Sequence, residues 1–244
     1  MREQNIGMRA DAALRGEDSF LQGVKDCIPT LLGYLSIGFA AGVVEKTAGL
    51  SVAEIALMSL CLYAGSAQFI AAGMLAANGS ASAIIITIFF VNLRHILLSA
   101  ALSPYFRHLS GIRNMLVGAL LTDETFGVAI NEAAKQNRIS ERWMHGLNIT
   151  AYSNWFIANI AGAYFGQWIA EPEKFGLDFA LPAMFIGLLV LSMVSRKKWL
   201  LDSVVAVSAV VITVGASIMF GGNVGVIAAT VIASTIGLVM EKWK

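Results

Sequence analysis

Two long stretches of the chain contain no acidic, basic or histidine side chain, and they limit what the chain can fold into. Residues 55–93 and 203–240 lack these side chains over 39 and 38 consecutive positions. A helix needs about 20 apolar residues to cross the roughly 30 Å hydrocarbon core of a bilayer, so each stretch has room for two helices and a turn. Only 14% of all residues are charged, whereas soluble domains have roughly a quarter. The sequence therefore predicts an all-α integral membrane protein.

Eight apolar segments predict about eight transmembrane helices, with breaks expected inside some of them. Short sequences typical of turns separate the segments. The segments are residues 27–45, 52–77, 81–103, 112–131, 144–168, 178–195, 199–220 and 223–241. Residues 1–25, which mix acidic and basic side chains, are interpreted as a cytoplasmic tail, and residues 26–244 as a single transmembrane domain.

The basic residues predict the orientation of these spans. With eight spans, both termini lie on the same side of the membrane. That side then carries 12 of the 17 Lys and Arg residues and the opposite side carries 4, while Arg94 lies within a span. Cytoplasmic loops are enriched in Lys and Arg, so the bias predicts a multi-pass protein of the inner membrane with both termini in the cytoplasm. An odd number of spans would weaken the bias, which favours eight spans over seven.

A weak internal similarity suggests an inverted repeat. The first and sixth segments begin with the same three residue types, and they cross the membrane in opposite directions, as such a repeat requires. The matching residues are Asp26, Pro29 and Gly33 in the first segment and Asp178, Pro182 and Gly187 in the sixth. Three loosely spaced residues can also match by chance. Pro29, Gly33 and Pro182 are, in addition, candidate helix breaks.

Polar residues gather near the centres of four segments. Ionisable groups inside a bilayer cost about 2.5–3.5 kcal/mol each on insertion scales, so they usually mark a transport pathway or an ion pair. The clusters are Tyr63, Gly65, Ser66 and Gln68 in the second segment, Asn92, Arg94 and His95 in the third, Thr122, Asp123 and Glu124 in the fourth, and Ser153, Asn154 and Trp155 in the fifth. Their similar depth predicts that they form one site.

The charged residues of this predicted site allow two interpretations. Arg94 can simply neutralise Asp123 or Glu124 as an interhelical ion pair. Successive residues on a helix point about 100° apart, so one carboxylate would remain for an aqueous cavity and could take a proton; Glu124 is slightly favoured for that role. His95 is either a proton relay or a neutral residue that holds its helix by a hydrogen bond.

The small residues around Gly65 also allow two interpretations. Residues 63–67 can allow close packing of helices, as small residues often do in membranes. Alternatively the helix is broken there, and its freed amides and the Ser66 hydroxyl bind a substrate carboxylate. The same alternatives apply to residues 29–33 and to Pro182. Trp155 lines a cavity or serves packing.

Several function classes lack support in the sequence. The chain has no G-x-x-x-x-G-K loop, no H-E-x-x-H spacing and no G-x-S-x-G elbow, so neither ATP hydrolysis nor another enzyme activity is expected. No metal or other cofactor is expected either. The net charge is +1 without a basic tract, which argues against a nucleic-acid partner. Cys27 and Cys61 lie in apolar segments and are interpreted as reduced thiols rather than a disulfide.

Three motifs together resemble a known family. The sequences YAGSAQF at 63–69, NLRH at 92–95 and TDE at 122–124 occur in the order and spacing of the AzlC family. This is the azaleucine-resistance or branched-chain amino acid exporter family of YgaZ-like permeases. The resemblance extends from about residue 20 to the C-terminus.

The resemblance implies a secondary transporter that exports branched-chain amino acids and methionine, driven by the proton gradient or the membrane potential. It also implies a second, small hydrophobic membrane subunit of the AzlD (YgaH) type. In this hypothesis the substrate carboxylate contacts the polar residues near Gly65, its ammonium group contacts Asp123 or Glu124, and its side chain contacts an apolar wall that includes Phe69. The expected substrate-binding residues are Gly65, Ser66, Gln68, Asn92, Asn154 and Trp155, and the expected coupling or ion-pair residues are Arg94, His95, Asp123 and Glu124.

Two rival functions remain open at this point. The chain could transport another small organic solute, or it could be a membrane subunit that only supports assembly.

Overall fold

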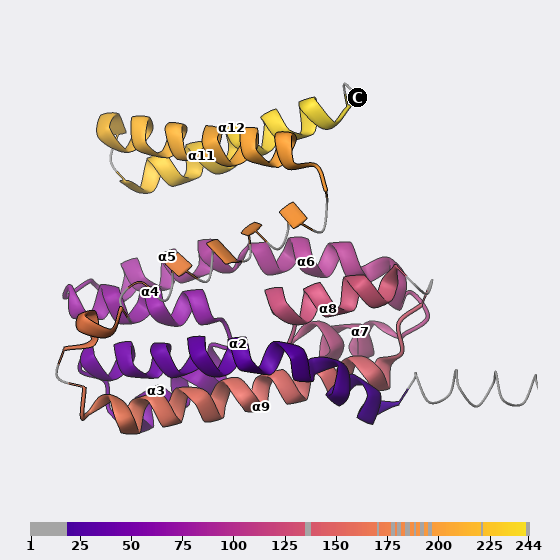
Figure 1. Ribbon diagram of the computed structural model, residues 1–244, viewed down its shortest axis with the longest axis horizontal. Coiled ribbons are helices and arrows are strands. Elements are labelled where there is room, and N and C mark those ends of the chain that lie inside the picture. Colours follow the sequence, from indigo (N-terminus) through magenta and orange to yellow (C-terminus); the bar gives the residue numbers. More distant parts are fainter. Residues whose placement is uncertain are drawn as a thin grey trace, which may run out of the picture. The chain divides into compact units, whose positions relative to one another are not determined.

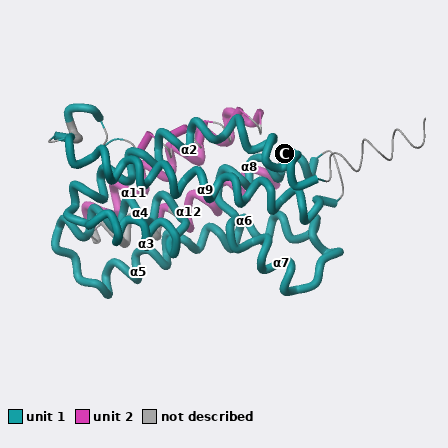
Figure 2. The backbone as a smooth tube through the Cα atoms, turned by 90° about the horizontal axis from the view of Figure 1, so that it is seen from below, with its two compact units in different colours: residues 1–181 teal, residues 182–244 magenta. Residues whose placement is uncertain are grey.

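The structure is a computed structural model in which every described element is a helix. It describes residues 19–134, 138–169, 171–176, 179, 182–183, 186–187, 189–190, 193–194, 197–220 and 222–242. No strand occurs in this part of the chain, which agrees with the predicted all-α class. The chain divides into two compact units, Met1–Leu181 and Pro182–Lys244, coloured separately in Figure 2. Each unit is described by itself.

Unit 1 contains helices of two length classes. Two single helices are long, α2 (Phe20–Thr47) and α9 (Glu141–Gly166), while α5 (Ala81–Asn92) and α6 (Arg94–Leu102) follow one another and form a third long segment only together. The short ones are α3 (Val52–Cys61), α4 (Gly65–Ala76), α7 (Gly111–Gly118) and α8 (Asp123–Ala133), with the 3-10 turns η1 (Ser103–Phe106) and η2 (Pro172–Phe175). Helices α2 and α5–α6–η1 are each long and apolar enough to span a membrane. Helix α9 has 26 residues, or about 39 Å of helix.

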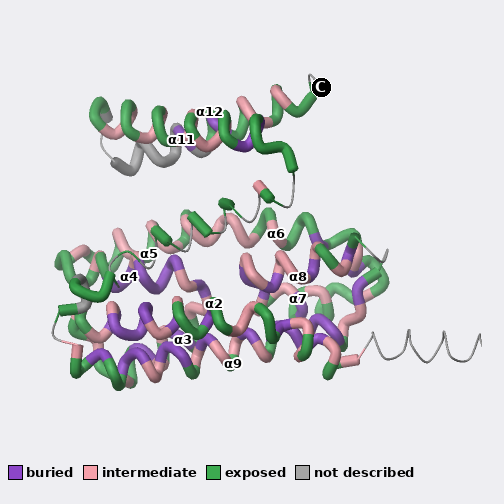
Figure 3. Tube along the Cα trace, in the orientation of Figure 1, coloured by how far each residue is buried: buried purple, intermediate pink, exposed green. Residues whose placement is uncertain are grey.

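Helices α2 and α9 run parallel and form the framework of unit 1. A Cβ atom added to Gly23, near the start of α2, would lie 1.9 Å from the carbonyl oxygen of Trp143, near the start of α9. One added to Gly42, near the end of α2, would lie 2.0 Å from the carbonyl oxygen of Asn159. The two backbones touch at both places, and only glycine allows that approach. Figure 3 shows that buried residues follow both helices along much of their length.

Helices α3 and α4 form a hairpin that enters unit 1 and returns to the same end. Helix α3 begins just after α2 ends, and residues 62–64 form a non-helical turn before α4. A Cβ at Gly65, the first residue of α4, would lie 2.7 Å from the ring of Trp155. Gln68, one turn later, bonds to Glu45 and Asn159. Because Glu45 and Asn159 lie towards the C-terminal ends of α2 and α9, α4 leads back to the end where α3 began.

Helix α7 enters unit 1 from the opposite end. At its start, Arg113 lies 3.5 Å from Glu141, the first residue of α9. Near its end, the Val117 carbonyl accepts a hydrogen bond of 2.8 Å from Asn148. The helix therefore advances beside α9 towards the middle of the unit. Its 8 residues measure only about 12 Å, far short of the roughly 30 Å hydrocarbon core.

Helix α8 then returns to the end from which α7 came. Its N-cap residue, Thr122, bonds to Tyr34 in the middle of α2. After the end of α8, the Ile139 amide donates a hydrogen bond to the Tyr105 carbonyl in η1. The turn η1 is the element just before α7 in the sequence. Figure 1 shows the two hairpins at opposite ends of unit 1, with α3 and α4 at one end and α7 and α8 at the other.

The predicted second and fourth spans, residues 52–77 and 112–131, are therefore hairpins of half-length helices. The breaks expected inside some segments are present here, whereas eight full spans are not confirmed at these two places. The prediction that both segments are largely apolar and helical is correct. Hydropathy cannot distinguish a segment that continues through the membrane from one that reverses at its middle. The reversals occur at residues 62–64 and 119–122.

The hairpin α7–α8 also changes which basic residues lie on the same side of the protein. Arg113, placed by the eight-span prediction on the side opposite Arg138 and Arg142, lies beside them. All three line one cavity of about 650 Å³ together with His108. One end of unit 1 is thus rich in basic residues.

Cysteine labelling can test this arrangement. We expect His108→Cys and Arg138→Cys to react with an impermeant maleimide from one side of the membrane, and Ser80→Cys and Lys174→Cys from the other. The eight-span prediction instead pairs Ser80 with Arg138 and His108 with Lys174. Accessibility in right-side-out and inverted vesicles distinguishes the two pairings.

The background for this experiment should lack the native thiols. Cys27 and Cys61 are both free, and Cys61 is exposed. Labelling of His108→Cys and Arg138→Cys from opposite sides would contradict the hairpin α7–α8.

Pro29 and Gly33 do not break the first helix, contrary to prediction. Helix α2 continues through both of them from Phe20 to Thr47. Pro29 removes only its own amide donor, and the tight packing along the rest of α2 supports the helix on both sides of it. A Cβ at Gly33 would meet no atom within 4 Å.

Unit 2 contains a pair of antiparallel helices, α11 (Trp199–Phe220) and α12 (Gly222–Lys242). Lys198 bonds to Glu241 at 2.6 Å, and Gly237 packs against Val205. The predicted sixth segment, residues 178–195, is described only in part, and Asp178 lies outside the described residues. The predicted break at Pro182 and the predicted inverted repeat between the first and sixth segments therefore stay predictions.

Candidate functional site

The guanidinium group of Arg94 joins the tips of the two hairpins. Its Nη1 atom lies 2.6 Å from Oδ2 of Asp123, the first residue of α8. Its Nη2 atom donates a 2.8 Å hydrogen bond to Oγ of Ser66, the second residue of α4. Arg94 itself begins α6, directly after the junction with α5. The three polar motifs of the sequence therefore meet at one place.

The Arg94–Asp123 pair is not sealed from its surroundings. The two side chains are 24% and 18% exposed. The pair is therefore only partly buried, and the desolvation cost of its two charges is smaller than for a sealed pair.

A capping box sets the tip of α8. The Thr125 amide donates to Oγ1 of Thr122, and the Thr122 amide donates to Oγ1 of Thr125. This places Asp123 and Glu124 in the first turn, where the partial positive charge of the helix N-terminus favours acidic side chains. The threonines thus position both carboxylates.

Glu124 points to a different partner from Asp123. Tyr34 in α2 donates a 3.1 Å hydrogen bond to Oε2 of Glu124, and its hydroxyl also bonds to Thr122. The two adjacent carboxylates therefore separate: one pairs with Arg94 and the other does not.

The tip of α4 has no side-chain cap. Its N-cap residue, Ala64, has extended backbone angles and makes no capping hydrogen bond through its side chain. The helix break that was one of the two interpretations of residues 63–67 is therefore present. The packing interpretation holds as well, because a Cβ at Gly65 would lie 2.7 Å from the Trp155 ring.

A second polar network lies beside the first. Gln68 is completely buried, and its Oε1 atom accepts a 2.7 Å hydrogen bond from the Trp155 indole. Its Nε2 atom donates to Glu45 at 3.1 Å and to Asn159 at 3.2 Å. The rings of Tyr34 and Trp155 meet edge to face at 5.9 Å, which connects this network with the α8 tip.

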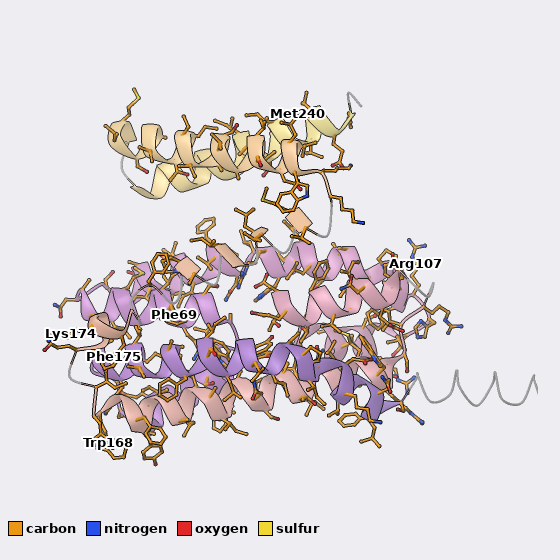
Figure 4. All side chains as sticks on the ribbon, viewed as in Figure 1. Phe69, Arg107, Trp168, Lys174, Phe175 and Met240 are labelled. Atoms are coloured by element: carbon orange, nitrogen blue, oxygen red, sulfur yellow. The ribbon has the colours of Figure 1, made fainter. Side chains whose placement is uncertain are left out.

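The structure places the other predicted residues less centrally. Asn92 and His95 flank Arg94 at the α5–α6 junction, and Asn92 Oδ1 and His95 Nε2 are buried without a hydrogen-bond partner among the described residues. Asn154 lies apart from the site and donates to the Leu31 carbonyl at 3.0 Å. Phe69, labelled in Figure 4, is 6% exposed and packs in the core of unit 1.

Sequence reasoning missed three residues of these networks: Tyr34, Glu45 and Asn159. Asn159 could have been found, because it lies one helical turn after Trp155 and shares its face. Tyr34 and Glu45 carry no comparable signal, since Tyr34 has no polar motif beside it and Glu45 lies at the end of its apolar segment, next to Lys46 and Thr47. Only the packing of α2 against α4, α8 and α9 shows what they contact.

An apolar cavity adjoins the α7–α8 tip. It has a volume of about 580 Å³ and lies between α6, η1, α7 and α9. Ala119 and Leu121 from the hairpin turn line it, with Leu102, Phe106 and Met144. Its size falls within the roughly 300–1,000 Å³ of small-molecule sites. Within the described residues, no group of three His, Cys, Asp or Glu side chains could hold a metal ion.

Comparison with known proteins finds several related membrane proteins. The chain is 30% identical to "Inner membrane protein YgaZ" of Escherichia coli over 234 residues, which are 94% of each chain. It is 33% identical over 183 residues to an "Uncharacterized membrane protein" of Archaeoglobus fulgidus, covering 72% of this chain and 77% of the other. It is 26% identical over 197 residues to "Branched-chain amino acid transport protein AzlC" of Bacillus subtilis, covering 80% and 75%.

No solved structure matches the chain. The family model described as "AzlC protein" matches residues 29–169, which include most of α2 and all of both hairpins, α5, α6 and α9. All residues of the two polar networks lie within this match. The chain therefore belongs to the AzlC family of membrane proteins.

Proposed function

We propose that this protein is a secondary active transporter subunit that exports branched-chain amino acids, and methionine, across the cytoplasmic membrane. The observation that carries the proposal is the Arg94 guanidinium group, which joins the tips of two hairpins that enter unit 1 from opposite ends. The name of the Bacillus subtilis relative supports the substrate class.

The charges of the site suit a zwitterion. The α-carboxylate of an amino acid would take the place of Asp123 on Arg94, with the uncapped N-terminus of α4 and the Ser66 hydroxyl beside it. The α-ammonium group would bind the released Asp123 and Glu124. Inserting a zwitterion into an ion pair leaves no net charge uncompensated, which matters because unpaired charges are costly away from water. An anionic or cationic solute lacks this match.

The remaining residues serve as supports in this proposal. Gln68 and Trp155 use their polar groups on protein partners, so we assign them to holding the α4 tip. The aliphatic side chain of the substrate would enter the cavity beside Leu121. Asn92 and His95 have a buried polar atom each that a substrate or a water molecule could satisfy.

The basic end of unit 1 supports an orientation for the proposed transporter. Lys25, Arg107 and Arg113 lie at this end with Arg138 and Arg142, whereas Lys46 and Lys174 lie at the other. By the excess of Lys and Arg in cytoplasmic loops, we infer that the basic end and the N-terminus face the cytoplasm. The hairpin α7–α8 then opens towards the cytoplasm and α3–α4 towards the outside.

We further propose that the transporter works with a small hydrophobic subunit of the AzlD type and is driven by the proton gradient or the membrane potential. The long apolar side chains of α5 and α6, such as Phe89 at 62% exposed and Leu97 at 72%, would face this subunit or lipid.

Uptake of labelled leucine into inverted membrane vesicles tests the proposal, with and without the small subunit. We expect uptake that needs an imposed proton gradient or potential. Unlabelled isoleucine, valine and methionine should compete with it. Leucinol, which lacks the carboxylate, and 4-methyl-2-oxopentanoate, which lacks the ammonium group, should not.

The outcome separates the rival functions. Competition by a different class of solute would indicate another substrate. No uptake under any condition, with the protein verified in the membrane, would favour a subunit that only supports assembly.

A further inference from the structure

Glu45 is a completely buried acid that the proposed substrate site does not use. It lies near the end of α2 and is 0% exposed. Its Oε1 atom accepts a hydrogen bond of 3.1 Å from Gln68 in α4. Its Oε2 atom is buried without a hydrogen-bond partner among the described residues. One of the two carboxyl oxygens is therefore unsatisfied.

No cation compensates Glu45 among the described side chains around it. Helix α4 presents Gln68, and α9 presents Asn159, which binds the same Gln68 amide. The neighbouring Lys46 donates to the Leu50 carbonyl instead, and Lys174 in η2 pairs with Glu171. The acid of α3, Glu54, is exposed and bonds to Ser51.

The cost of burying a charge determines the protonation state of a carboxyl group like that of Glu45. Burying an ionised carboxylate without a counter-ion costs several kcal/mol, so the group takes a proton as long as it stays buried. A neutral carboxyl can still accept the Gln68 hydrogen bond through its carbonyl oxygen. The conformation described here is therefore compatible with a protonated Glu45.

We propose that Glu45 carries the coupling proton and that its loss opens the hairpin α3–α4. This proposal rests on the proposed transport function. When the O–H bond of the carboxyl breaks, the proton passes to water at the non-basic end of unit 1. The carboxylate left behind must be hydrated, which requires α4 to move away from α2 and α9. Rebinding of a proton closes the hairpin again.

Helix α4 is the element that moves in this proposal. Helices α2 and α9 touch backbone to backbone at Gly23 and Gly42, whereas side-chain hydrogen bonds through Gln68 hold α4 to both. Ser66, two residues before Gln68, binds Arg94. Opening of α4 therefore separates Ser66 from Arg94. The protonation state of Glu45 thus affects the substrate site, because Gln68 and Ser66 lie on the same helix.

A thiol placed under α4 tests the opening without any substrate. Ala72 lies one turn after Gln68 on the buried face of α4 and is 0% exposed. In a background without Cys27 and Cys61, we expect the labelling rate of Ala72→Cys to rise several-fold as the pH is raised. Division by the rate of Leu75→Cys, an exposed position of the same helix, removes the pH dependence of thiol chemistry itself.

Variants of the acid give the expected contrast. Glu45→Gln should keep the corrected labelling rate of Ala72→Cys low and independent of pH, because the amide copies the protonated carboxyl. Glu45→Asp should keep the pH dependence, and so should Glu54→Gln, the matched change of an exposed acid. In vesicles, Glu45→Gln should lose proton-driven leucine uptake, whereas Glu54→Gln should keep it.

Two labelling results would overturn the inference, and neither depends on whether leucine is the substrate. The first is a corrected labelling rate that rises with pH in Glu45→Gln as it does in the wild type. The second is a corrected rate that does not change with pH in the wild type. Absence of leucine uptake by the wild type would instead count against the proposed function. Because Glu45→Gln is neutral and nearly isosteric, thermal unfolding in detergent should find it folded, and unfolding of this variant alone would also contradict a protonated Glu45.

Discussion

Replacement of Asp123 by Asn is expected to abolish leucine uptake while the protein remains folded in the membrane. The change removes the partner of Arg94 at 2.6 Å and one of the two carboxylates proposed for the substrate ammonium group. Truncating one partner of a buried charge pair typically costs 2–5 kcal/mol of binding, so leucine affinity should fall by about thirtyfold or more. At leucine concentrations well below saturation, uptake should therefore fall by at least about thirtyfold, towards that of vesicles without the protein.

Stability should change less than transport in this variant. Breaking a fully buried pair costs about 3–5 kcal/mol, and the partial exposure of Arg94 and Asp123 reduces this to about 1–3 kcal/mol. Glu141→Gln is the matched control, because it removes the acid that pairs with the more exposed Arg113. Thermal unfolding in detergent checks that both variants fold.

The reversed pair adds a second test. Arg94→Asp with Asp123→Arg restores an ion pair but exchanges the positions of the charges relative to Ser66 and Glu124. We expect it to recover stability without recovering leucine uptake. Normal uptake by Asp123→Asn, at normal expression, would show that this carboxylate is not part of the transport site.

Substitution of Gly42 or Gly162 by Ala is expected to destabilise the protein severely. The added Cβ would lie 2.0 Å from the Asn159 carbonyl oxygen at Gly42, and 2.1 Å from the Phe39 carbonyl oxygen at Gly162. Overpacking usually costs 1–3 kcal/mol, and here the obstacle is backbone, which cannot rotate away, so we expect about 3 kcal/mol or more. The measurement is the fraction of folded protein after extraction, together with its thermal midpoint.

Gly33→Ala is the matched control on the same helix. Its Cβ would meet no atom within 4 Å, and alanine in a helix interior is favoured over glycine by roughly 0.5–1 kcal/mol. We therefore expect this variant to be as stable as the wild type or slightly more stable. If Gly42→Ala melted at the same temperature as Gly33→Ala, the close parallel packing of α2 and α9 would be wrong.

The sequence was sufficient to predict the helical class and most helix positions, but not the reversal of two segments. The apolar length of a segment can be read directly from its residues, so residues 52–77 and 112–131 were predicted correctly as apolar helical segments. Whether a segment continues or returns depends on what its tip contacts. Gln68 meets Glu45 and not a residue near the start of α2, and no periodicity within the segment contains that information.

The ion pair at the centre of the candidate site was predictable, because a charged side chain inside a membrane is costly unless an opposite charge compensates it. Arg94 needed an anion, and the structure confirms that it pairs with Asp123 and leaves Glu124 over. Neutral residues were harder to assign. Asn154 and Trp155 are adjacent in sequence, yet only Trp155 joins the networks, because the two side chains point to different faces of α9.

An experimental structure of the protein with bound leucine tests the central claim most directly. We expect leucine between the two hairpin tips, with its carboxylate on Arg94 and Ser66, its ammonium group on Asp123 and Glu124, and the Arg94–Asp123 pair separated by the ligand. Leucine bound elsewhere, with that ion pair intact, would contradict the proposed binding mode.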